Sequence, residues 1–392
     1  MLNAGVSPWP FHTPEEVDAV VAVLKSGRVN YWTGDECRMF EREFAAAVGC
    51  EKGVAVANGT LALDLALNGL GIGAGDEVIV TPRTFIASVS TVVNAGAIPV
   101  FAEVDRDSGN ITAETIARVV TPRTRAIICV HLAGWPCDMD PIKQLADAHD
   151  LSVVEDCAQA HGAAYRGRPV GSLGNAGAWS FCQDKIMSTG GEGGMVTTDD
   201  EALWSSMWSF KDHGKSWNAV YEREHPPGYR WLHETIGTNW RMLEIQAAIG
   251  RVQLRSLSDW TSRRNEIARR YAAAAQRFPA AIRAPWVDDR DTHAAYRYYC
   301  YVRPEGLRDG WSRDRIIAEA GARNVPLFQG SCSEVYLERA FDVAPGRPAE
   351  RFPIARELGE TSIMFLTHPT LSDAEVDRIA DEFTAILDEA TR

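Results

Sequence analysis

Apolar segments of strand length alternate with amphipathic segments of helix length in the first half of the chain, and this alternation limits the fold more than any other feature. Segments that are apolar at nearly every position suit strands buried on both faces of a parallel sheet. The alternation predicts an α/β domain with right-handed crossovers and a ligand site at the carboxyl ends of its strands. The predicted strands cover 77–81, 98–104, 125–131 and 151–155, and the predicted helices cover 60–70, 85–94, 112–120 and 141–149.

A different pattern begins near residue 250. A long helical pattern covers 251–278, an aromatic-rich strand pattern covers 295–302, and an amphipathic helix pattern covers 372–390. A chain of 392 residues is expected to form two or three domains. We therefore predict a large α/β domain over residues 1–255 and a small α+β domain over residues 256–392, with a helix running across the boundary.

The charge balance excludes several classes of partner. Lys plus Arg number 40 against 53 Asp plus Glu, a formal net charge of −13. Such a chain repels phosphate backbones and anionic lipid, so we expect no nucleic acid and no membrane partner. The amino terminus does not resemble a secretion signal, and no apolar run is long enough to cross a membrane. Because the eight cysteines and nine histidines also form no metal-ligand cluster, we predict a reduced, cytoplasmic protein without a metal site.

Asn58, Gly59 and Thr60 stand between a strand pattern that ends at Val56 and the helix pattern that follows. The first N–H groups of a helix have no partner within it and face outward at the positive end of the helix dipole, which makes an anion site. A cap on a buried helix explains the same residues without a ligand. Both interpretations stay open.

Glu155 and Asp156 end a predicted buried strand, where two carboxylates are costly unless they are solvated, paired or facing a ligand. An acceptor-only carboxylate in the crevice above the sheet suits a protonated ring nitrogen or a metal. Gln159 and His161 follow and offer further hydrogen-bonding groups. A pair of surface acids at a strand end is the alternative.

Lys185 is flanked by apolar residues and is followed by G-G-E-G-G at 190–194, which does not resemble a solvated charge run. Glycines allow close backbone approach, and a lysine near its neutral amine form is what Schiff-base chemistry needs. The glycines follow the lysine, so the segment is not a P-loop, and the G-x-G-x-x-G dinucleotide fingerprint is also missing. For the lysine alone, a surface residue is the alternative.

Two further segments lie before the predicted domain boundary. Residues 237–250 form a loop that enters a helix with Ala and Gly on one face, which suits close helix packing. Residues 217–231 are expected to form a long loop near the site, which either shapes the choice of acceptor or contacts a partner subunit.

Taken together, the segments match one cofactor. An anion-binding helix start, a strand-end carboxylate and a lysine 29 residues after it suit the phosphate, the pyridine nitrogen and the aldehyde of pyridoxal phosphate. The residues also resemble the DegT/DnrJ/EryC1/StrS family of pyridoxal-phosphate-dependent sugar aminotransferases, from about Pro14 to Leu387. The motifs that carry the resemblance are N-G-T, E-D-x-A-Q-A-H-G-A, S-F-x-x-x-K with G-G-E-G-G, and G-x-N-x-R-M-x-E-x-Q-A-A, in this order.

The resemblance implies a fold-type I aminotransferase, with a mostly parallel central sheet flanked by helices in the large domain. It also implies that Lys185 forms the internal aldimine with pyridoxal 5'-phosphate and then moves a proton. Asp156 would pair with the pyridinium nitrogen, and Gln159 would lie beside the O3' side of the ring. A related branch that dehydrates sugars carries His at position 185, so the lysine disfavours that branch.

The same resemblance implies how the rest of the cofactor is held. The backbone N–H groups of Gly59 and Thr60 and the hydroxyl of Ser180 would bind the phosphate. Phe85 would stack on the ring, and Asn239 would reach the phosphate from the neighbouring subunit of a homodimer, whose active sites would then be shared. Cys and Gln at positions 182 and 183 depart from the common family pattern of an aromatic and a small residue, which leaves the substrate open.

The implied reaction is ping-pong transfer from L-glutamate, with pyridoxamine 5'-phosphate as the intermediate, to a nucleotide-linked keto sugar. A 4-keto-6-deoxy sugar comes first and a 3-keto sugar next, for surface polysaccharide such as the O-antigen of lipopolysaccharide, or for antibiotic sugars. The rival interpretations are an amino-cyclitol or aminobenzoate aminotransferase of the same family and a non-catalytic sensor or scaffold. A metal-dependent sugar isomerase fails for want of ligand clusters.

Overall fold

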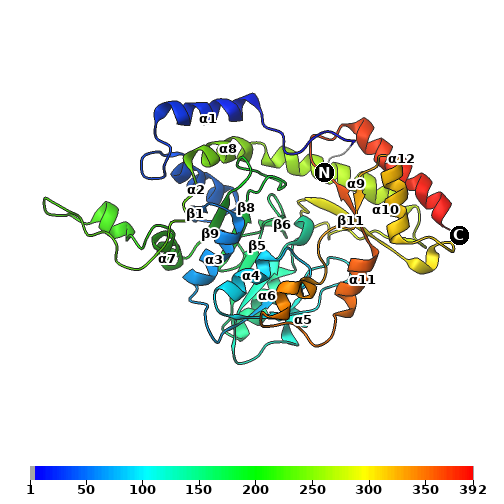
Figure 1. The fold of residues 1–392 in the computed structure, drawn as a ribbon, viewed down its shortest axis with the longest axis horizontal. Helices are drawn as coiled ribbons and strands as arrows, with labels where there is room; N and C mark the ends of the chain where they lie inside the picture. The colour runs from blue at the N-terminus through cyan, green and yellow to red at the C-terminus, as the bar shows by residue number, and fades with distance from the viewer. Residues whose placement is uncertain (1–4, 392) are drawn as a thin grey trace.

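A seven-stranded sheet forms the centre of the molecule in the computed structural model, which describes residues 5–391 (Figure 1). The strand order is β1-β9-β8-β5-β4-β2-β3. β9 runs antiparallel to both of its neighbours, and all other neighbouring pairs are parallel. The predicted α/β class with a mostly parallel sheet is confirmed. The strands are β1 (Lys52–Val56), β2 (Glu77–Val80), β3 (Ile98–Phe101), β4 (Thr124–Val130), β5 (Ser152–Asp156), β8 (Ala176–Ser180) and β9 (Gly194–Thr198).

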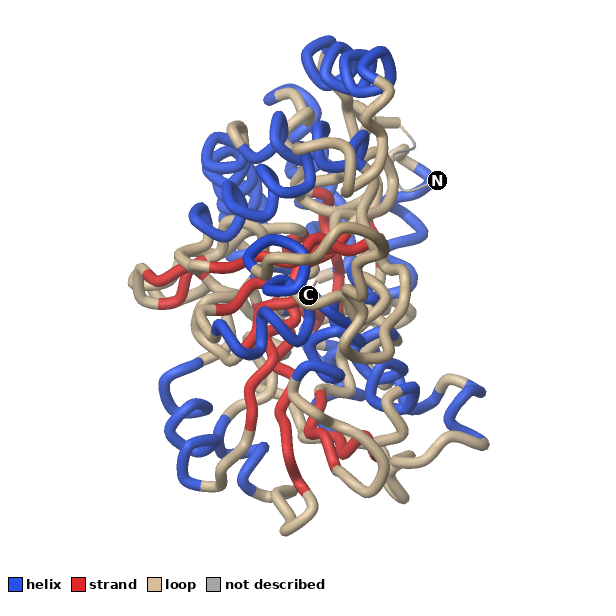
Figure 2. The backbone as a smooth tube through the Cα atoms, turned by 90° about the vertical axis from the view of Figure 1, so that its left-hand side faces the viewer, coloured by secondary structure: helices blue, strands red, loops and turns tan. Residues whose placement is uncertain are grey.

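Alternate residues of the central strands pack into two separate hydrophobic cores, because successive side chains of a strand point to opposite faces. Val78 and Val80 of β2 belong to the core that contains α3 and α4, whereas Ile79 belongs to the core that contains α6 and α11. Figure 2 shows the strands running through the middle of the molecule with helices outside them. These helices are α2 (Glu36–Ala47), α3 (Gly59–Gly69), α4 (Ala87–Asn94), α5 (Ala113–Ala117), α6 (Met139–Ala148), α7 (Glu201–Lys211) and α11 (Pro353–Thr361).

A second, antiparallel sheet of four strands has the order β10-β11-β13-β12 and a hydrophobic core of its own. Ser372 caps the last helix by accepting a hydrogen bond from the N–H of Glu375. The predicted strand at 295–302 and the predicted terminal helix are both present. The elements are β10 (Ile282–Arg283), β11 (Arg297–Val302), β12 (Leu327–Phe328), β13 (Ser362–Leu366), α9 (Leu257–Gln276), α10 (Arg313–Ala322) and α12 (Asp373–Ala390), with a small hairpin of β6 (Ala164–Tyr165) and β7 (Arg168–Pro169) elsewhere.

The prediction of one helix across 251–278 is wrong. α8 (Glu244–Leu254) ends at Leu254 and α9 begins at Leu257, with Arg255 and Ser256 between them. α8 packs against α1 (Pro14–Ser26) and α2, whereas α9 packs against α12 and β11. The chain therefore turns where it passes from one set of neighbours to the other, and the division at residue 255 stays a prediction. None of the helices in the described residues is both long enough and apolar enough to span a bilayer.

Candidate active site

A cavity of about 560 Å³ opens at the carboxyl ends of β4 and β5, beside the start of α3. Parallel strands present their carboxyl ends at the same edge of a sheet, so residues from several loops meet there. Seven of the eight predicted site residues line this cavity. They are Gly59, Thr60, Phe85, Asp156, Gln159, Ser180 and Lys185. The eighth, Asn239, is exposed and lies outside the lining of the cavity in its own chain.

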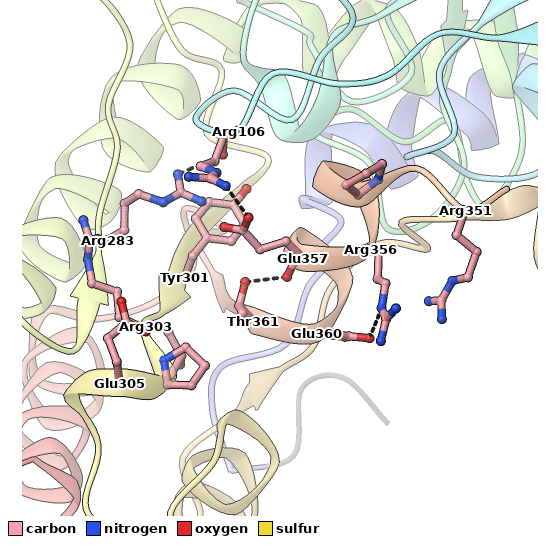
Figure 3. Close-up of a pocket in the computed structure, with 13 residues that line it drawn as sticks. Arg106, Arg283, Tyr301, Arg303, Glu305, Arg351, Arg356, Glu357, Glu360 and Thr361 are labelled. Atoms are coloured by element: carbon pink, nitrogen blue, oxygen red, sulfur yellow. Dashed lines mark hydrogen bonds and ion pairs between the residues drawn. The ribbon is translucent and has the colours of Figure 1, made fainter.

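A larger cavity of about 670 Å³ lies between the loop that carries Arg106, strand β11 and helix α11 (Figure 3). Two ion pairs join charged residues of its lining. The guanidinium of Arg106 lies 2.7 Å from a carboxylate oxygen of Glu357, and that of Arg356 lies 2.8 Å from Glu360. Lys185 lines the smaller cavity, and we therefore place the candidate active site there.

One side of the smaller cavity is formed where α3 meets β8. Asn58 caps α3, and its side chain accepts a hydrogen bond of 3.0 Å from the N–H of Leu61. A Cβ on Gly59 would lie 2.4 Å from the Cβ of Ser180, so only glycine allows this close approach. The helix cap and the anion site are therefore compatible, because Asn58 caps while Gly59 and Thr60 present their N–H groups beside the Ser180 hydroxyl.

Asp156 supplies a carboxylate to the cavity at the end of β5. Its Oδ2 accepts a hydrogen bond of 2.7 Å from the hydroxyl of Ser88, and its Oδ1 accepts one of 3.1 Å from the N–H of Ala158. The Ser88 hydroxyl lies 2.7 Å from that of Thr84. These partners fix the orientation of the carboxylate, which then suits a protonated ring nitrogen.

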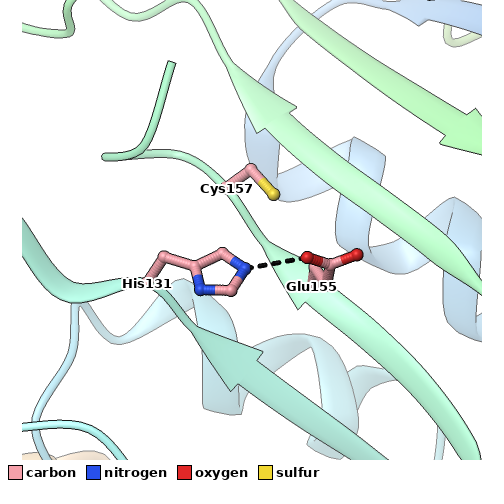
Figure 4. A group of neighbouring side chains, drawn as sticks. All are labelled: His131, Glu155 and Cys157. Carbon is pink, nitrogen blue, oxygen red and sulfur yellow. Dashed lines mark hydrogen bonds and ion pairs between the residues drawn. The ribbon is translucent and has the colours of Figure 1, made fainter. Parts of the chain in front are cut away.

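Glu155 faces the other side of the sheet, where it lies beside His131 and Cys157 (Figure 4). Burial alone raises the pKa of Glu155, but its hydrogen bonds to His131 and to backbone N–H groups outweigh that effect and lower it. The His131 Nδ1 accepts from the N–H of Cys137, so its Nε2 carries the proton toward Glu155. The two carboxylate oxygens of Glu155 accept hydrogen bonds from four donors. Because these bonds occupy the carboxylate, it supports the end of the strand and is not free to bind a metal ion. The donors are His131 Nε2 at 3.0 Å and the N–H groups of Gly171, Leu173 and Gly174 at 2.8, 2.7 and 2.7 Å.

Gln159 and His161 also lie in different surroundings, the first at the cavity and the second in the core. The Oε1 of Gln159 accepts a hydrogen bond of 2.8 Å from the N–H of Ala133 at the cavity. His161 is buried against the rings of Phe44, Trp179 and Phe181, and burial lowers the pKa of its imidazole to about 3. The expectation that His161 adds a hydrogen-bonding group to the site is therefore wrong, because its ring packs in the core instead.

Lys185 extends into the cavity from the loop after β8. Its Nζ lies 3.8 Å from the Oδ1 of Asp184 and 5.1 Å from the centre of the Tyr296 ring. Burial lowers the pKa of this lysine, but Tyr296, Asp184 and Asp156 act in the opposite direction and the net pKa is raised. These neighbours therefore favour the ammonium form of Lys185 in the protein without its cofactor, whereas Schiff-base chemistry needs the neutral amine.

Distant parts of the chain fasten this lysine loop. The Trp9 indole donates a hydrogen bond of 2.9 Å to the carbonyl oxygen of Lys185. The N–H of Ser188 donates one of 2.8 Å to the Oε1 of Gln253, and the Tyr296 hydroxyl donates one of 2.5 Å to Asp184. The sequence motifs did not reveal these contacts, nor the contact of Ser88 with Asp156.

Two parts of the chain expose large apolar side chains. Phe85 is 65% exposed at the mouth of the cavity, where its ring is available for stacking. The arm, which we define as residues 215–240, projects from the large sheet at the left of Figure 1. It exposes the large apolar side chains of Tyr229, Trp231 and Ile236, the last of which is 93% exposed. Clustered exposed apolar side chains mark an interaction surface.

Comparison with known proteins places these residues in a family context. The model of the DegT/DnrJ/EryC1/StrS aminotransferase family matches residues 10–384. The chain is similar to dTDP-3-amino-3,4,6-trideoxy-alpha-D-glucose transaminase of Streptomyces venezuelae, with 37% identity over 93% of this chain and 90% of that protein. It is also similar to GDP-perosamine synthase of Caulobacter vibrioides, with 36% identity over 89% of each chain.

Among solved structures, an aminotransferase from Psychrobacter cryohalolentis superposes with a TM-score of 0.97. That protein is 58% identical, and the match covers 98% of this chain and 99% of the other. The agreement extends over both sheets, so the two-sheet architecture is shared with an experimentally solved aminotransferase.

Proposed function

The chain belongs to the DegT/DnrJ/EryC1/StrS aminotransferase family, and we propose that it moves the amino group of L-glutamate to a nucleotide-linked keto sugar. It is a pyridoxal-phosphate-dependent sugar aminotransferase. The donor, the position of the keto group and the nucleotide are the parts that we propose here.

One observation carries the proposal. One cavity of about 560 Å³ is lined by a lysine, an oriented carboxylate and the start of a helix. At that helix start, only glycine is small enough to lie against Ser180. This set fits the three ends of pyridoxal phosphate, which supplies an electron sink next to the substrate carbon when it is bound.

The residues divide the work as follows. Lys185 provides the amine and moves a proton at its Nζ, and Asp156 keeps a proton on the ring nitrogen. Gly59, Thr60 and Ser180 hold the phosphate through N–H groups and a hydroxyl. Gln159 orients the ring edge and Phe85 covers a ring face; both line the cavity.

A homodimer completes the site in this proposal. Asn239 lies at the base of the arm and outside the lining of the cavity in its own chain. The exposed Trp231 and Ile236 supply apolar surface for a second copy of the chain. The phosphate would then receive Asn239 from the partner subunit.

The acceptor is a 4-keto-6-deoxy sugar on a nucleotide, with a 3-keto sugar next. The names of both similar enzymes include a nucleotide-linked sugar. The product would enter surface-polysaccharide or antibiotic sugar synthesis in the cytoplasm. An amino-cyclitol or aminobenzoate acceptor would lack the nucleotide, and a scaffold protein would not turn over at all.

The first test is the visible absorption spectrum of the purified protein with pyridoxal phosphate, before and after L-glutamate. We expect a yellow band that bleaches with L-glutamate and persists with D-glutamate. Lys185→Ala should stay folded and lack both the band and the transfer. A wild-type protein that remains colourless contradicts the proposal and supports the scaffold interpretation.

The second test addresses the acceptor. We expect UDP, dTDP or GDP to protect the glutamate-treated protein from thermal unfolding, and the matching nucleotide keto sugar to restore the yellow band. Recovery of the band with a keto-cyclitol, together with indifference to all three nucleotides, would establish the rival acceptor class.

A further inference from the structure

The charged groups around Lys185 come from both sheets of the molecule. The Oδ2 of Asp184 accepts a hydrogen bond of 2.5 Å from the Tyr296 hydroxyl, and Tyr296 directly precedes β11 of the small sheet. The Nη2 of Arg297, the first residue of β11, lies 3.9 Å from the same oxygen. The other oxygen of Asp184 lies 3.8 Å from the Lys185 Nζ.

The Asp184 carboxylate lies within 4 Å of two cationic groups, the Lys185 amine and the Arg297 guanidinium. Lys185 and Arg297 both face it, and the Arg297 guanidinium also lies 4.1 Å from the centre of the Tyr296 ring. Removing the carboxylate charge would leave two like charges with nothing between them, and like charges at this range disfavour the charged form of each group. Asp184 is thus placed to decide the state of the lysine amine.

We propose that Asp184 and Tyr296 form a positioning pair for Lys185, in which the carboxylate holds the free amine as an ammonium and the tyrosine hydroxyl holds the carboxylate. This inference rests on the proposed role of Lys185 and goes beyond it. It assigns a task to Tyr296, which directly precedes β11 and lies outside the lining of the cavity. Neither residue reacts, and both act through the lysine.

The charges near the lysine support this assignment. Burial, Lys185, the Tyr296 hydroxyl and Arg297 all act on Asp184, and the net effect lowers its pKa, so the carboxylate is ionised. Burial raises the pKa of Tyr296, so the phenol stays neutral near pH 7 and serves as a donor. The titratable and charged groups that face the lysine or this pair are Asp156, Cys182, Asp184, Tyr296 and Arg297, with His161 and Arg264 behind them.

The pair also links two parts of the fold. Asp184 belongs to the loop after β8 of the large sheet, and Tyr296 enters β11 of the small sheet. Tyr296 therefore holds the Asp184 carboxylate only while the start of β11 is docked as it is here. Its displacement would take the Tyr296 hydroxyl and Arg297 away from Asp184, whereas Asp184 would stay beside Lys185.

The test is a titration of Lys185 in the protein without cofactor. The sequence contains only six lysines, so protein labelled with ¹³C at the lysine Cε gives few signals, and Lys185→Arg assigns the relevant one. We expect Asp184→Asn to lower the pKa of Lys185 by about one unit or more, because an opposite charge at this distance shifts a pKa by about 1–3 units. Tyr296→Phe should lower it by less, and Asp184→Glu should restore part of the shift.

Matched controls are available in the chain. Asp138 accepts a hydrogen bond of 2.5 Å from the Tyr165 hydroxyl, and neither residue lines the cavity. Asp138→Asn removes the same charge from the same kind of pair and should leave the Lys185 titration unchanged. Tyr298→Phe removes a buried hydroxyl from β11 that has no hydrogen-bond partner among residues 5–391, and it should also leave the titration unchanged.

An Asp184→Asn titration that matches wild type overturns the inference. If Asp184→Asn does not fold, Tyr296→Phe decides, since it keeps every carboxylate, and an unchanged lysine titration then overturns the inference equally. The pH dependence of the yellow band gives a second readout, in which Asp184→Asn should move the transition to lower pH. Absence of the band in wild type would count against the proposed function, whereas an intact band with an unchanged titration would count only against the pair.

Discussion

Glu155 and Asp156 are neighbours in β5, yet their carboxylates serve opposite faces of the central sheet. Asp156 lines the cavity and accepts a hydrogen bond from Ser88. Glu155 accepts from His131 and from the loop at 171–174. Successive strand residues point to opposite sides. Glu155 therefore stabilises the end of β5 from one face, and Asp156 extends into the cavity from the other.

Glu155→Gln should destabilise the fold. The amide places a donor against backbone N–H donors in a fully buried position, and breaking such a buried charged network costs about 3–5 kcal/mol. Urea unfolding at pH 7.5 measures the loss, and Glu114→Gln, on an exposed side chain, is the control. The pKa of Glu155 is lowered in the folded state, so its contribution is present above about pH 4.5 and is lost as the pH falls. Equal stability of the variant and wild type at pH 7.5 would contradict a structural role for the hydrogen bonds of Glu155.

Asp156→Asn should weaken activation of the cofactor much more than Ser88→Ala does. The first change removes the counter-charge of the ring nitrogen, and loss of one such electrostatic group costs about 10²–10³ in kcat. The second removes one hydrogen bond and leaves the charge, with an expected cost of about 0.5–1.5 kcal/mol. Steady-state kinetics with cofactor titration separates the two, and equal effects of both variants would argue against a charge role for Asp156.

Gly59→Ala should impair cofactor binding because its Cβ would lie 2.4 Å from the Cβ of Ser180. Overpacking of this kind costs about 1–3 kcal/mol, and displacement of Ser180 should also raise the dissociation constant for pyridoxal phosphate. Gly321→Ala is the matched control, because a Cβ at Gly321 in α10 would meet no atom of the described residues within 4 Å beyond its chain neighbours and its own helix backbone. That control should gain about 0.5–1 kcal/mol in thermal stability and bind the cofactor as wild type does.

Mixed dimers should recover activity that neither parent variant has. Lys185→Ala removes the amine, and Asn239→Ala removes the side chain that we propose to act in the partner's site. A heterodimer of the two keeps one complete site out of two, so random mixing should give about one quarter of wild-type activity. No recovery above the parent proteins would place Asn239 in the site of its own chain.

Stability should fall below about pH 6.5. Burial lowers the pKa values of His161, His293 and His368 to about 3. Because these groups stay neutral when folded and take up protons when unfolded, stability is fully present above the unfolded pKa and decreases as the pH falls from 6.5 toward 3. The slope is up to about 1.4 kcal/mol per pH unit for each group. Urea unfolding between pH 5 and 7.5 should show this slope. His293→Gln should reduce the number of protons taken up on unfolding by up to one, and the slope should fall accordingly. A free energy of unfolding that does not change with pH would contradict the prediction.

The sequence patterns predicted the parts of the fold that depend on local periodicity. The four predicted strands correspond to β2, β3, β4 and β5 within a few residues. Seven of the eight predicted site residues line one cavity, because each ends or follows a strand of the same sheet or starts the helix beside it. The motifs and the family resemblance named these residues, and sheet topology explains why they meet, since it brings strand ends together.

Other features depend on contacts that spacing does not reveal. The alternation in β5 indicates that Glu155 and Asp156 face opposite sides but not which side holds the cavity. The break at Arg255 arises because α8 and α9 pack on different neighbours. The contact of Tyr296 with Asp184 joins residues 112 positions apart, and no local sequence pattern in either segment predicts it.

The fastening of the lysine loop has a consequence for biosynthesis. Its three anchors, Trp9, Gln253 and Tyr296, lie at widely separated places along the chain. A nascent chain that has not yet emerged beyond Tyr296 has only part of this support, whatever the state of its large sheet. The yellow colour of the bound cofactor would thus report that translation has passed Tyr296, and a ribosome-bound fragment ending before that residue should remain pale.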